Sequence, residues 1–316
     1  MPARIVPYVI GLLQAPNITA TFLKRQFGFS HDQLTRTLKK KIHWQRLVIW
    51  VIQRLFGVLS CGYLIIDDTT IAKPYAKNLE GASFVYSSVL EKTVYGYQVV
   101  LLCWSNGWMT LPLVWRFYQK GGASKVDLAQ ALVQELHDHW QLTPETVVFD
   151  SWYAAARLLD QLNGYGWEFV CQIKRNRIVN ACRVDDDLVA DGDSLVGPIT
   201  GWFLGKVLRH EEKFFLTNQV EMGNELLLHR YGERWAIETV FRFVKNQLHL
   251  EACQARSRTA QETHLGSCIL TYLILQKELV QHTDQTQTLY SLKTEWYLNR
   301  RLGRNRIKHY VKVLTA

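Results

Sequence analysis

Four residues in the stretch YGERWAIETVFRFVK, positions 231 to 245, could together act on a charged ligand. They are Tyr231, Arg234, Glu238 and Lys245, spaced by three, four and seven positions. Because an α-helix turns by about 100° per residue, this spacing predicts a helix over 231–250 with all four side chains on one side. A carboxylate between cations could hold a metal ion beside a negatively charged ligand. Solvated helix faces carry such charges more often, so this interpretation requires further acidic residues.

Two aspartates end short apolar runs that read as β-strands: Asp68 in GYLIIDDTT and Asp150 in TVVFD. Residues at the carboxyl ends of neighbouring strands gather at one edge of an open sheet. Crowded carboxylates repel one another unless a cation holds them, and oxygen ligands without cysteine or histidine are typical of Mg²⁺ or Mn²⁺ sites. Two ions about 4 Å apart can bind the attacking and leaving oxygens of a phosphodiester. The sequence thus predicts a metal site formed by Asp68, Asp150 and Glu238.

Each of these acids also has an ordinary structural interpretation. An aspartate at a strand end is often a turn residue, and Asp150 before SWYAAARLL is a good helix N-cap. Asp67 and Asp68 are neighbours, and successive strand residues face opposite ways, so only one of them is expected to reach the metal ions. Taken together with the strand order and the basic charge of the chain, the acids favour a shared site.

The elements that must position these acids follow from the periodicity of the apolar residues. Residues 61–175 read as β-β-β-α-β-α-β, with the first three strands antiparallel. Residues 1–60 read as a helical module in which Ser30 and Gln33 form a capping box. Its basic face suits DNA, although a solvated lysine-rich helix fits equally well.

The second half of the chain is less regular. Residues 176–213 are acidic and rich in turn residues, and we interpret them as an insertion. Residues 214–280 resume the core with a strand in KFFLTN, the glutamate helix and a long apolar helix. Residues 281–316 form a basic C-terminal segment, which is either a contributor of sequence-independent DNA affinity or a solvated tail.

The composition narrows the class of protein and of partner. The 316 residues include 37 Lys and Arg against 28 Asp and Glu, a net charge of +9 that suits a polyanion, with nucleic acid first and an anionic membrane second. Six cysteines without a CxxC pair predict neither a zinc ribbon nor a disulfide framework. No uncharged run is long enough to cross a membrane, so a cytoplasmic, nucleoid-associated protein is expected.

With these motifs in place, the chain resembles a bacterial insertion-sequence transposase of the DDE class, in the group with the Y-x2-R-x3-E-x6-K signature. Tyr231, Arg234, Glu238 and Lys245 match all four signature positions. IIDDTT and VVFDSWY, which carry the two strand-end aspartates, also resemble the family pattern, and the similarity runs from about 61 to 275.

The resemblance implies an α/β fold: an RNase H-like mixed five-stranded sheet flanked by helices, interrupted by a β-rich insertion before the glutamate helix. It implies a metal-dependent enzyme that nicks transposon ends and transfers the 3′ ends into target double-stranded DNA, with Mg²⁺ or Mn²⁺, as a homodimer bridging two ends. Asp68, Asp150 and Glu238 would be metal ligands, and Tyr231, Arg234 and Lys245 would bind the DNA backbone.

The family pattern also bears on the aspartate doublet and the insertion. Family members commonly show the first aspartate followed by threonine, directly or after one residue, which favours Asp68 over Asp67 as the ligand. The insertion, at roughly 40 residues, is short for the family, so a hairpinned end intermediate does not follow from the resemblance. Trp152 and Trp202 could stack on an extruded base, although packing is the more common role of tryptophan.

Two other functions remain open on the sequence. One is a decayed or domesticated transposase that only occupies transposon ends, and the other is a stand-alone metal-dependent nuclease of the same fold. Simple binding requires no converging carboxylates in a cationic protein, which disfavours the first. Failure to join a cut 3′ end to a second DNA would favour the second.

Overall fold

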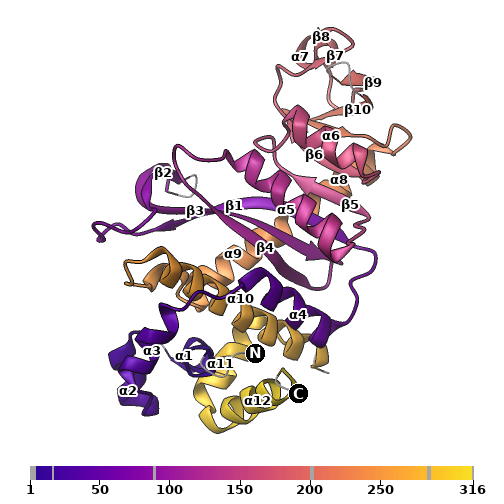
Figure 1. Cartoon of the computed structure of the whole chain (residues 1–316). Coiled ribbons are helices and arrows are strands. Elements are labelled where there is room, and N and C mark those ends of the chain that lie inside the picture. The colour runs from indigo at the N-terminus through magenta and orange to yellow at the C-terminus, as the bar shows by residue number, and fades with distance from the viewer. Residues whose placement is uncertain (1–4, 16–17, 88–89, 200–202, 283–285, 315–316) are drawn as a thin grey trace.

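The computed structural model describes residues 5–15, 18–87, 90–199, 203–282 and 286–314. A large mixed sheet runs through the middle of the molecule with helices on both faces (Figure 1). Helices α5 (Lys125–Trp140) and α6 (Ala156–Gly164) cover one face. Helices α9 (Trp235–Gln247) and α10 (Arg258–Gln281) cover the other. The expectation of a mixed sheet flanked by helices is confirmed.

The first six strands follow the predicted order, with one short addition. They are β1 (Tyr63–Ala72), β2 (Ser83–Ser87), β3 (Lys92–Ser105), β4 (Thr110–Tyr118), β5 (Thr146–Phe149) and β6 (Phe169–Ile173). β1 pairs antiparallel with β3, and β3 pairs antiparallel with β4 and with the unpredicted β2. On its other side β1 pairs parallel with β5, and β5 pairs parallel with β6. The predicted antiparallel arrangement of the first long strands is therefore confirmed.

The sheet continues through the insertion instead of stopping at β6. β11 (Lys213–Thr217) pairs antiparallel with β6 and is followed outward by β10 (Phe203–His210), β9 (Ser194–Ile199), β7 (Ile178–Val179) and β8 (Cys182–Arg183). A short helix, α7 (Val184–Asp187), lies among them. In the described residues the sheet thus has eleven strands, because β11 and the insertion strands beyond it extend the open edge of β6, and β2 adds a strand beside β3. This edge pairing makes the sheet larger than the five strands expected.

Both ends of the chain build one helical layer under the sheet (Figure 1). The N-terminal part supplies α1 (Val6–Gln14), α2 (Ala20–Phe27), α3 (His31–Leu38) and α4 (Trp44–Phe56). The C-terminal part supplies α10, α11 (Leu289–Leu298) and α12 (Arg300–Val313), so much of the basic segment is helical. Ser30 caps α3 by accepting a hydrogen bond from the Gln33 amide, as predicted. No helix of the described residues is both long and apolar enough to span a membrane.

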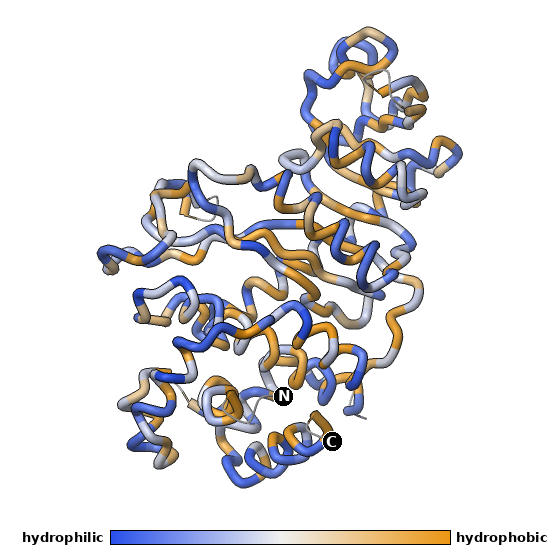
Figure 2. The backbone as a smooth tube through the Cα atoms, in the orientation of Figure 1, coloured by the Kyte–Doolittle hydropathy of each residue, from blue (hydrophilic) through white to orange (hydrophobic). Residues whose placement is uncertain are grey.

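Helix α10 is the centre of this layer. Its side chains are buried on nearly every side between residues 260 and 278, because α1, α3, α4, α9 and α11 surround it. Gly266 lies against the indole ring of Trp44 on α4, and a Cβ atom at position 266 would approach that ring to 2.1 Å. The glycine therefore allows the two helices to pack closely. Figure 2 shows the apolar segments concentrated in the sheet and in the inner helices.

A buried histidine, His264, links α10 to α1 and to the segment that follows α9. The Nδ1 atom of His264 accepts a hydrogen bond from the Tyr8 hydroxyl of α1 at 2.8 Å, and its Nε2 atom donates to the His249 carbonyl at 3.1 Å. Burial, assisted by the positive charge of Lys73, lowers the pKa of His264 to about 3. The native protein therefore holds this imidazole neutral.

This histidine predicts a loss of stability in acid. In the unfolded chain this histidine has its ordinary pKa of 6.5, so it binds a proton below that pH, whereas His264 in the native protein stays neutral. The free energy of unfolding therefore falls as the pH drops from 6.5 toward 3. Between about pH 7.5 and about pH 5 the expected contribution is roughly 2 kcal/mol. Urea unfolding of wild type and His264→Gln should show a smaller pH dependence in the variant. The exposed His31 on α3 supplies the control, His31→Gln, and equal pH dependence in all three proteins would contradict the prediction.

Candidate active site

The register of two parallel strands brings acidic residues together. Ile66 on β1 is level with Phe149, the last residue of β5, so Asp67 and Asp150 both follow at the carboxyl edge of the sheet. β5 ends there, whereas β1 continues to Ala72. Beyond Ile66, β1 therefore has no strand partner on the β5 side in the described residues, and the space beside it is open.

The predicted single helix over 231–250 is wrong, because the chain forms two helices there. Helix α8 (Asn224–Gly232) ends at a turn, and α9 begins at Trp235. At this junction amides bond to carbonyls three residues back, including Arg234 to Tyr231 at 3.0 Å. Such bonds tighten the backbone beyond α-helical geometry and shift every later side chain. Tyr231 is consequently not on the face that carries Glu238.

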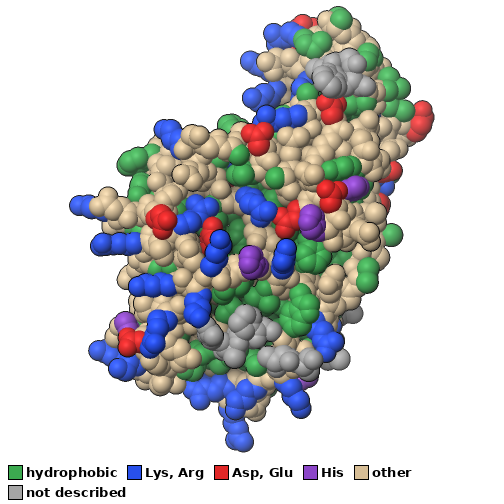
Figure 3. Space-filling view, viewed as in Figure 1, with side chains coloured by type: hydrophobic (Ala, Val, Ile, Leu, Met, Phe, Trp, Pro, Cys, Tyr) green, Lys and Arg blue, Asp and Glu red, His purple; other side chains and the backbone are tan. Residues whose placement is uncertain are grey.

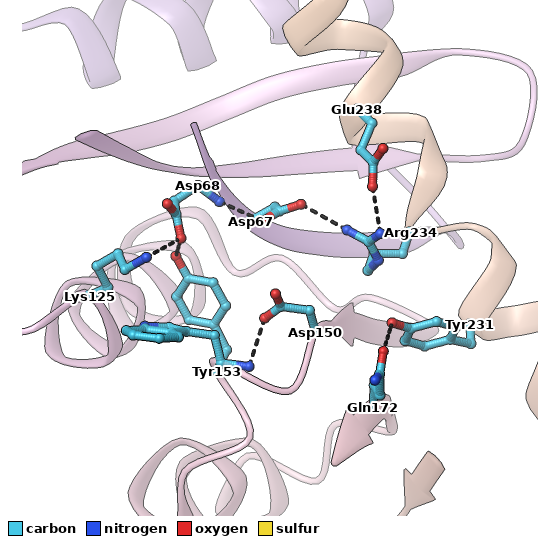
Figure 4. Close-up of polar contacts among 10 residues, drawn as sticks. Asp67, Asp68, Lys125, Asp150, Tyr153, Gln172, Tyr231, Arg234 and Glu238 are labelled. Carbon is cyan, nitrogen blue, oxygen red and sulfur yellow. Dashed lines mark hydrogen bonds and ion pairs between the residues drawn. The ribbon is translucent and has the colours of Figure 1, made fainter. Parts of the chain in front are cut away.

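Arg234 joins two of the acids directly. Its Nη1 atom lies 2.9 Å from Oδ2 of Asp67, and its Nη2 atom lies 2.5 Å from Oε1 of Glu238 (Figure 4). Glu238 lies one helical turn after Arg234, on α9. One nitrogen of the guanidinium therefore pairs with β1 and the other with α9. Arg234 is thus the counter-charge of a carboxylate pair that spans β1 and α9.

Asp68 is held by a different set of partners, on the side of α5. Its Oδ1 atom accepts hydrogen bonds from the Lys125 ammonium at 2.8 Å and the Tyr153 hydroxyl at 2.9 Å (Figure 4). Its Oδ2 atom accepts one from the Gln98 amide at 2.9 Å. Lys125 is the first residue of α5, after the capping box of Ser124 and Asp127.

These three partners of Asp68 were not found from the sequence. Gln98 lies in the middle of β3, and only the pairing of β3 with β1 brings it near. Tyr153 follows Asp150 closely in VVFDSWY, which was the one available signal. The sequence does not tell which of the two aromatic side chains points into the protein. In the structure Trp152 is more than half exposed and Tyr153 is fully buried.

Burial and crowding change the acidity of the neighbouring carboxyls. Burial is the main reason that the pKa of Asp67 rises to about 7, and the charge of Asp150 adds to it while Arg234 opposes it. Burial also raises the pKa of Asp150, against hydrogen bonds from the Trp152 and Tyr153 amides and with a contribution from Asp68. Both carboxyls are therefore protonated more readily than in water, mainly because burial disfavours their charged forms, and a bound cation would stabilise those charged forms.

A cavity of about 1390 Å³ connects these residues. Its charged lining consists of four carboxylates and seven cations: Asp67, Asp68, Asp150 and Glu238, with Lys120, Lys125, Arg157, Lys174, Arg234, Arg242 and Lys245. Both members of the aspartate doublet line it, beside the part of β1 that has no strand partner on the β5 side in the described residues. The expectation that only one of them reaches the metal ions stays a prediction. Figure 3 shows that Lys and Arg also predominate over the lower part of the molecular face.

The side chains that line the cavity are of the type that binds a hard divalent cation. The carboxylates supply oxygen ligands, with no cysteine or histidine in the lining of the cavity. In the described part of the chain, no three His, Cys, Asp or Glu side chains already form a group that could hold a metal ion. Arg234 instead bridges Asp67 and Glu238, so binding of a metal by Glu238 together with the aspartates requires the guanidinium to move.

The remaining predicted residues lie at different distances from this cavity. Lys245 lines it, with its ammonium 3.9 Å from Oε1 of Glu251, and burial lowers its pKa. Tyr231 does not line it: the hydroxyl donates to Oε1 of Gln172 at 3.1 Å, and the ring lies against Phe215 (Figure 4). Trp202 lies outside the described residues.

Comparisons with known proteins identify relatives of the chain. The family model described as "Transposase DDE domain" matches residues 63–274. No curated protein matches the sequence significantly. Among solved structures, the cryo-EM structure of the piggyBac transposase synaptic complex with hairpin DNA is similar, with a TM-score of 0.58 at 12% identity. That alignment covers 98% of this chain and 75% of the other, which indicates a shared fold.

Two further structures match with lower scores. Human ENDOV has a TM-score of 0.28 at 12% identity, covering 77% of this chain and 96% of its own. The Drosophila P element transposase strand transfer complex has a TM-score of 0.28 at 10% identity, covering 90% of this chain and 67% of its own. At these scores neither match bears on the fold or the site.

Proposed function

The chain belongs to the transposase DDE domain family, and from this premise we propose that it nicks transposon ends and joins the freed 3′ ends to target DNA. The observation that carries the proposal is the cavity where four carboxylates from β1, β5 and α9 meet among seven cations. Acids at the carboxyl edge of the sheet suit divalent metal, and the surrounding cations suit a phosphate backbone. Membership of the bacterial insertion-sequence group rests on the Y-x2-R-x3-E-x6-K match and is part of the proposal.

Asp68, Asp150 and Glu238 are the proposed metal ligands, with Asp67 the alternative to Asp68. Mg²⁺ is the proposed cofactor, with Mn²⁺ as substitute and two ions at work. Bound there, the ions would lower the pKa of the attacking water or 3′-hydroxyl and stabilise the leaving oxygen. Lys125, Tyr153 and Gln98 orient the Asp68 carboxylate through the hydrogen bonds that they already make.

The cations of the cavity are proposed to bind the DNA backbone. Arg234 is the N-cap residue of α9 and Lys245 lies in its last turn, so they flank Glu238 along the chain, and both line the cavity. Tyr231 is proposed to hold α8 against the sheet, because its hydroxyl donates a hydrogen bond to Gln172 on β6. The sequence-based expectation of a DNA contact at Tyr231 stays a prediction.

The division of the chain is likewise proposed. We assign β4, β3, β1, β5 and β6 to an RNase H-like core made by residues 61–175 and 214–280, with 176–213 as its insertion. Residues 1–60 and the basic segment 281–316 would add DNA contacts from the shared helical layer. Double-stranded DNA is the proposed partner, and a homodimer the proposed assembly on two transposon ends.

Cleavage and joining assays test this proposal. A labelled duplex carrying the ends of the flanking element should be nicked with Mg²⁺ or Mn²⁺ and remain intact with EDTA, and a pre-cut 3′ end should be joined to a second duplex. Cutting without joining would favour a stand-alone nuclease. Binding without cutting in any metal would favour a protein that only occupies the ends.

Neutralising Lys245 tests the proposed backbone contact. Lys245→Gln should weaken binding to duplex DNA and reduce the salt slope of log K by about 0.9, the value for one lost phosphate contact. Affinity should be measured over a salt series by fluorescence anisotropy without metal. Lys277→Gln is the control, because Lys277 lies on α10 over the ring of Phe56 and outside the cavity. An unchanged slope in Lys245→Gln would remove Lys245 from the DNA contacts.

A further inference from the structure

A second cavity, of about 720 Å³, lies beyond the acidic cavity that holds the four carboxylates. Among the described residues, no side chain lines both. β1 carries Asp67 and Asp68 into the acidic cavity and, a few residues later, Ala72 into the second one. The two cavities adjoin at one ion pair, because Lys245 lines the first, Glu251 lines the second, and their charged atoms are 3.9 Å apart. A ligand that leaves the acidic cavity along β1 would therefore arrive at the second cavity.

A buried lysine in the second cavity lacks a counter-charge. Lys73 is 5% exposed, and its ammonium donates to the carbonyls of Glu251 at 2.8 Å and Cys253 at 2.9 Å. An ammonium has three N–H donors, and the third has no partner in the described residues. The Glu251 carboxylate, which is the one acid in the described lining, is paired with Lys245 instead. Burial lowers the pKa of Lys73, and an anion beside the ammonium would oppose that shift.

Other residues add to the positive charge of this cavity. Lys77 and Arg256 line it, both are exposed, and neither side chain makes an ion pair or a hydrogen bond with a described residue. Thr19, the N-cap of α2, also lines it, so the positive end of that helix dipole lies at the cavity wall. His249 adds no charge near neutral pH, because burial lowers its pKa. Three cations and the end of a helix dipole therefore surround a space whose described lining has one carboxylate.

We propose that the second cavity binds one backbone phosphate of the DNA strand whose phosphodiester is cut in the acidic cavity. The identity of the strand rests on the proposed function, whereas the anion site depends only on the cations. A phosphate oxygen accepts the N–H that Lys73 leaves unused, and Lys77 and Arg256 bind the same group from the solvent side. From Asp68 to Ala72 the strand spans roughly 13 Å, and DNA advances about 3.4 Å per nucleotide, so this phosphate is about four nucleotides from the cut.

Neutral backbone substitutions can locate this phosphate. A methylphosphonate removes the charge of one phosphate, and a set of end duplexes carries it at each position within one helical turn of the cut. In EDTA, wild type should bind the duplex substituted about four nucleotides from the cut about five-fold more weakly than the unmodified duplex. The double variant Lys77→Gln, Arg256→Gln should show a salt slope of log K reduced by about 0.9 and no further loss on that substitution. Lys73 stays in place, because it holds two carbonyls.

The double variant Lys92→Gln, Lys213→Gln is the matched control. Both lysines are exposed and line neither cavity, so this protein loses the same charge but should keep the full sensitivity to the methylphosphonate. The same scan on a target duplex distinguishes the two sources of a DNA phosphate, and sensitivity confined to the target would overturn the assignment to the cut strand. Equal sensitivity in wild type and in the variant of Lys77 and Arg256 would overturn the site itself.

Inorganic phosphate tests the anion site without DNA. Relative to chloride at equal ionic strength, phosphate should stabilise wild type against urea, less so the variant of Lys77 and Arg256, and the control variant as much as wild type. This pattern in a protein that cuts DNA with no metal would keep the anion site and remove the transposase chemistry. Metal-dependent cutting by wild type, with no difference among the variants in either assay, would keep the chemistry and remove the anion site.

Discussion

Glu238→Gln is expected to abolish metal-dependent cutting while DNA affinity stays nearly unchanged. Asp150→Asn and Asp68→Asn should do the same, each with a loss of roughly a thousand-fold or more, equivalent to about 4 kcal/mol of transition-state stabilisation. The physical reason is that the amides keep the size of the side chains but remove the charge that a divalent ion requires. Cleavage of the labelled end duplex measures the first effect, and anisotropy without metal measures the second.

The aspartate doublet gives this experiment its internal control. Asp67 is paired with Arg234, and Asp68 is bonded by Lys125, Tyr153 and Gln98, yet both line the cavity. With Asp68 as the ligand, Asp67→Asn should retain cutting. The reverse pattern would transfer the role to Asp67, which lies level with Asp150 in the strand register. Loss of DNA affinity in Glu238→Gln comparable to its loss of cutting would contradict the assignment of the glutamate.

Arg234→Ala is expected to destabilise the metal-free protein by roughly 3 kcal/mol. The guanidinium is mostly buried and is the charge partner of both Asp67 and Glu238, whose side chains are 15% and 30% exposed. Its removal leaves these carboxylates near Asp150 without a counter-charge. Because the pKa of Asp67 is about 7, protonation of Asp67 limits the loss of stability at and below neutral pH. Urea unfolding at about pH 8 should therefore show a larger loss than at about pH 6.

Divalent metal should reverse this destabilisation. A cation that binds the native carboxylates but not the unfolded chain adds stability according to its concentration and affinity. Mg²⁺ or Mn²⁺ should therefore raise the stability of Arg234→Ala more than that of wild type, where the metal must compete with the guanidinium. Arg242→Ala is the matched control, because Arg242 is an exposed residue of α9 that also lines the cavity and lies 5.7 Å from the ring of Trp235. Equal responses of both arginine variants would contradict this role of Arg234.

The positions of the three acids could be predicted from the sequence because they depend on short-range patterns. The apolar runs before Asp68 and Asp150 fix where each strand carries its acid, and parallel pairing then places both acids at one edge. Ile237 and Val244 of α9 are buried at a spacing of seven that helical periodicity explains, whereas Phe241 between them lines the cavity. These features require no knowledge of distant contacts beyond the order of the strands.

Other parts of the site depend on details that periodicity does not carry. The break between α8 and α9 arises from three-residue hydrogen bonds at Glu233 and Arg234, which the regular spacing of the signature conceals. The partners of Asp68 come from β3, α5 and the turn after β5, so they depend on tertiary packing. The open edge of β1 beside the acids depends on relative strand length. TVVF has 4 residues and YLIIDDTTIA has 10, and this difference in length is present in the sequence.

The length of β1 beyond β5 also bears on the solubility of the protein. An uncovered strand edge exposes amide and carbonyl groups on which a strand of another molecule can pair, and a chain with such an edge risks aggregation. Here the edge begins at Asp67 and Asp68, and its far end is closed by Glu251, whose carboxylate accepts the Ala72 amide at 3.2 Å. Buried charge on an edge strand opposes pairing with a second copy. The acids proposed for chemistry would thus also oppose aggregation through this strand edge.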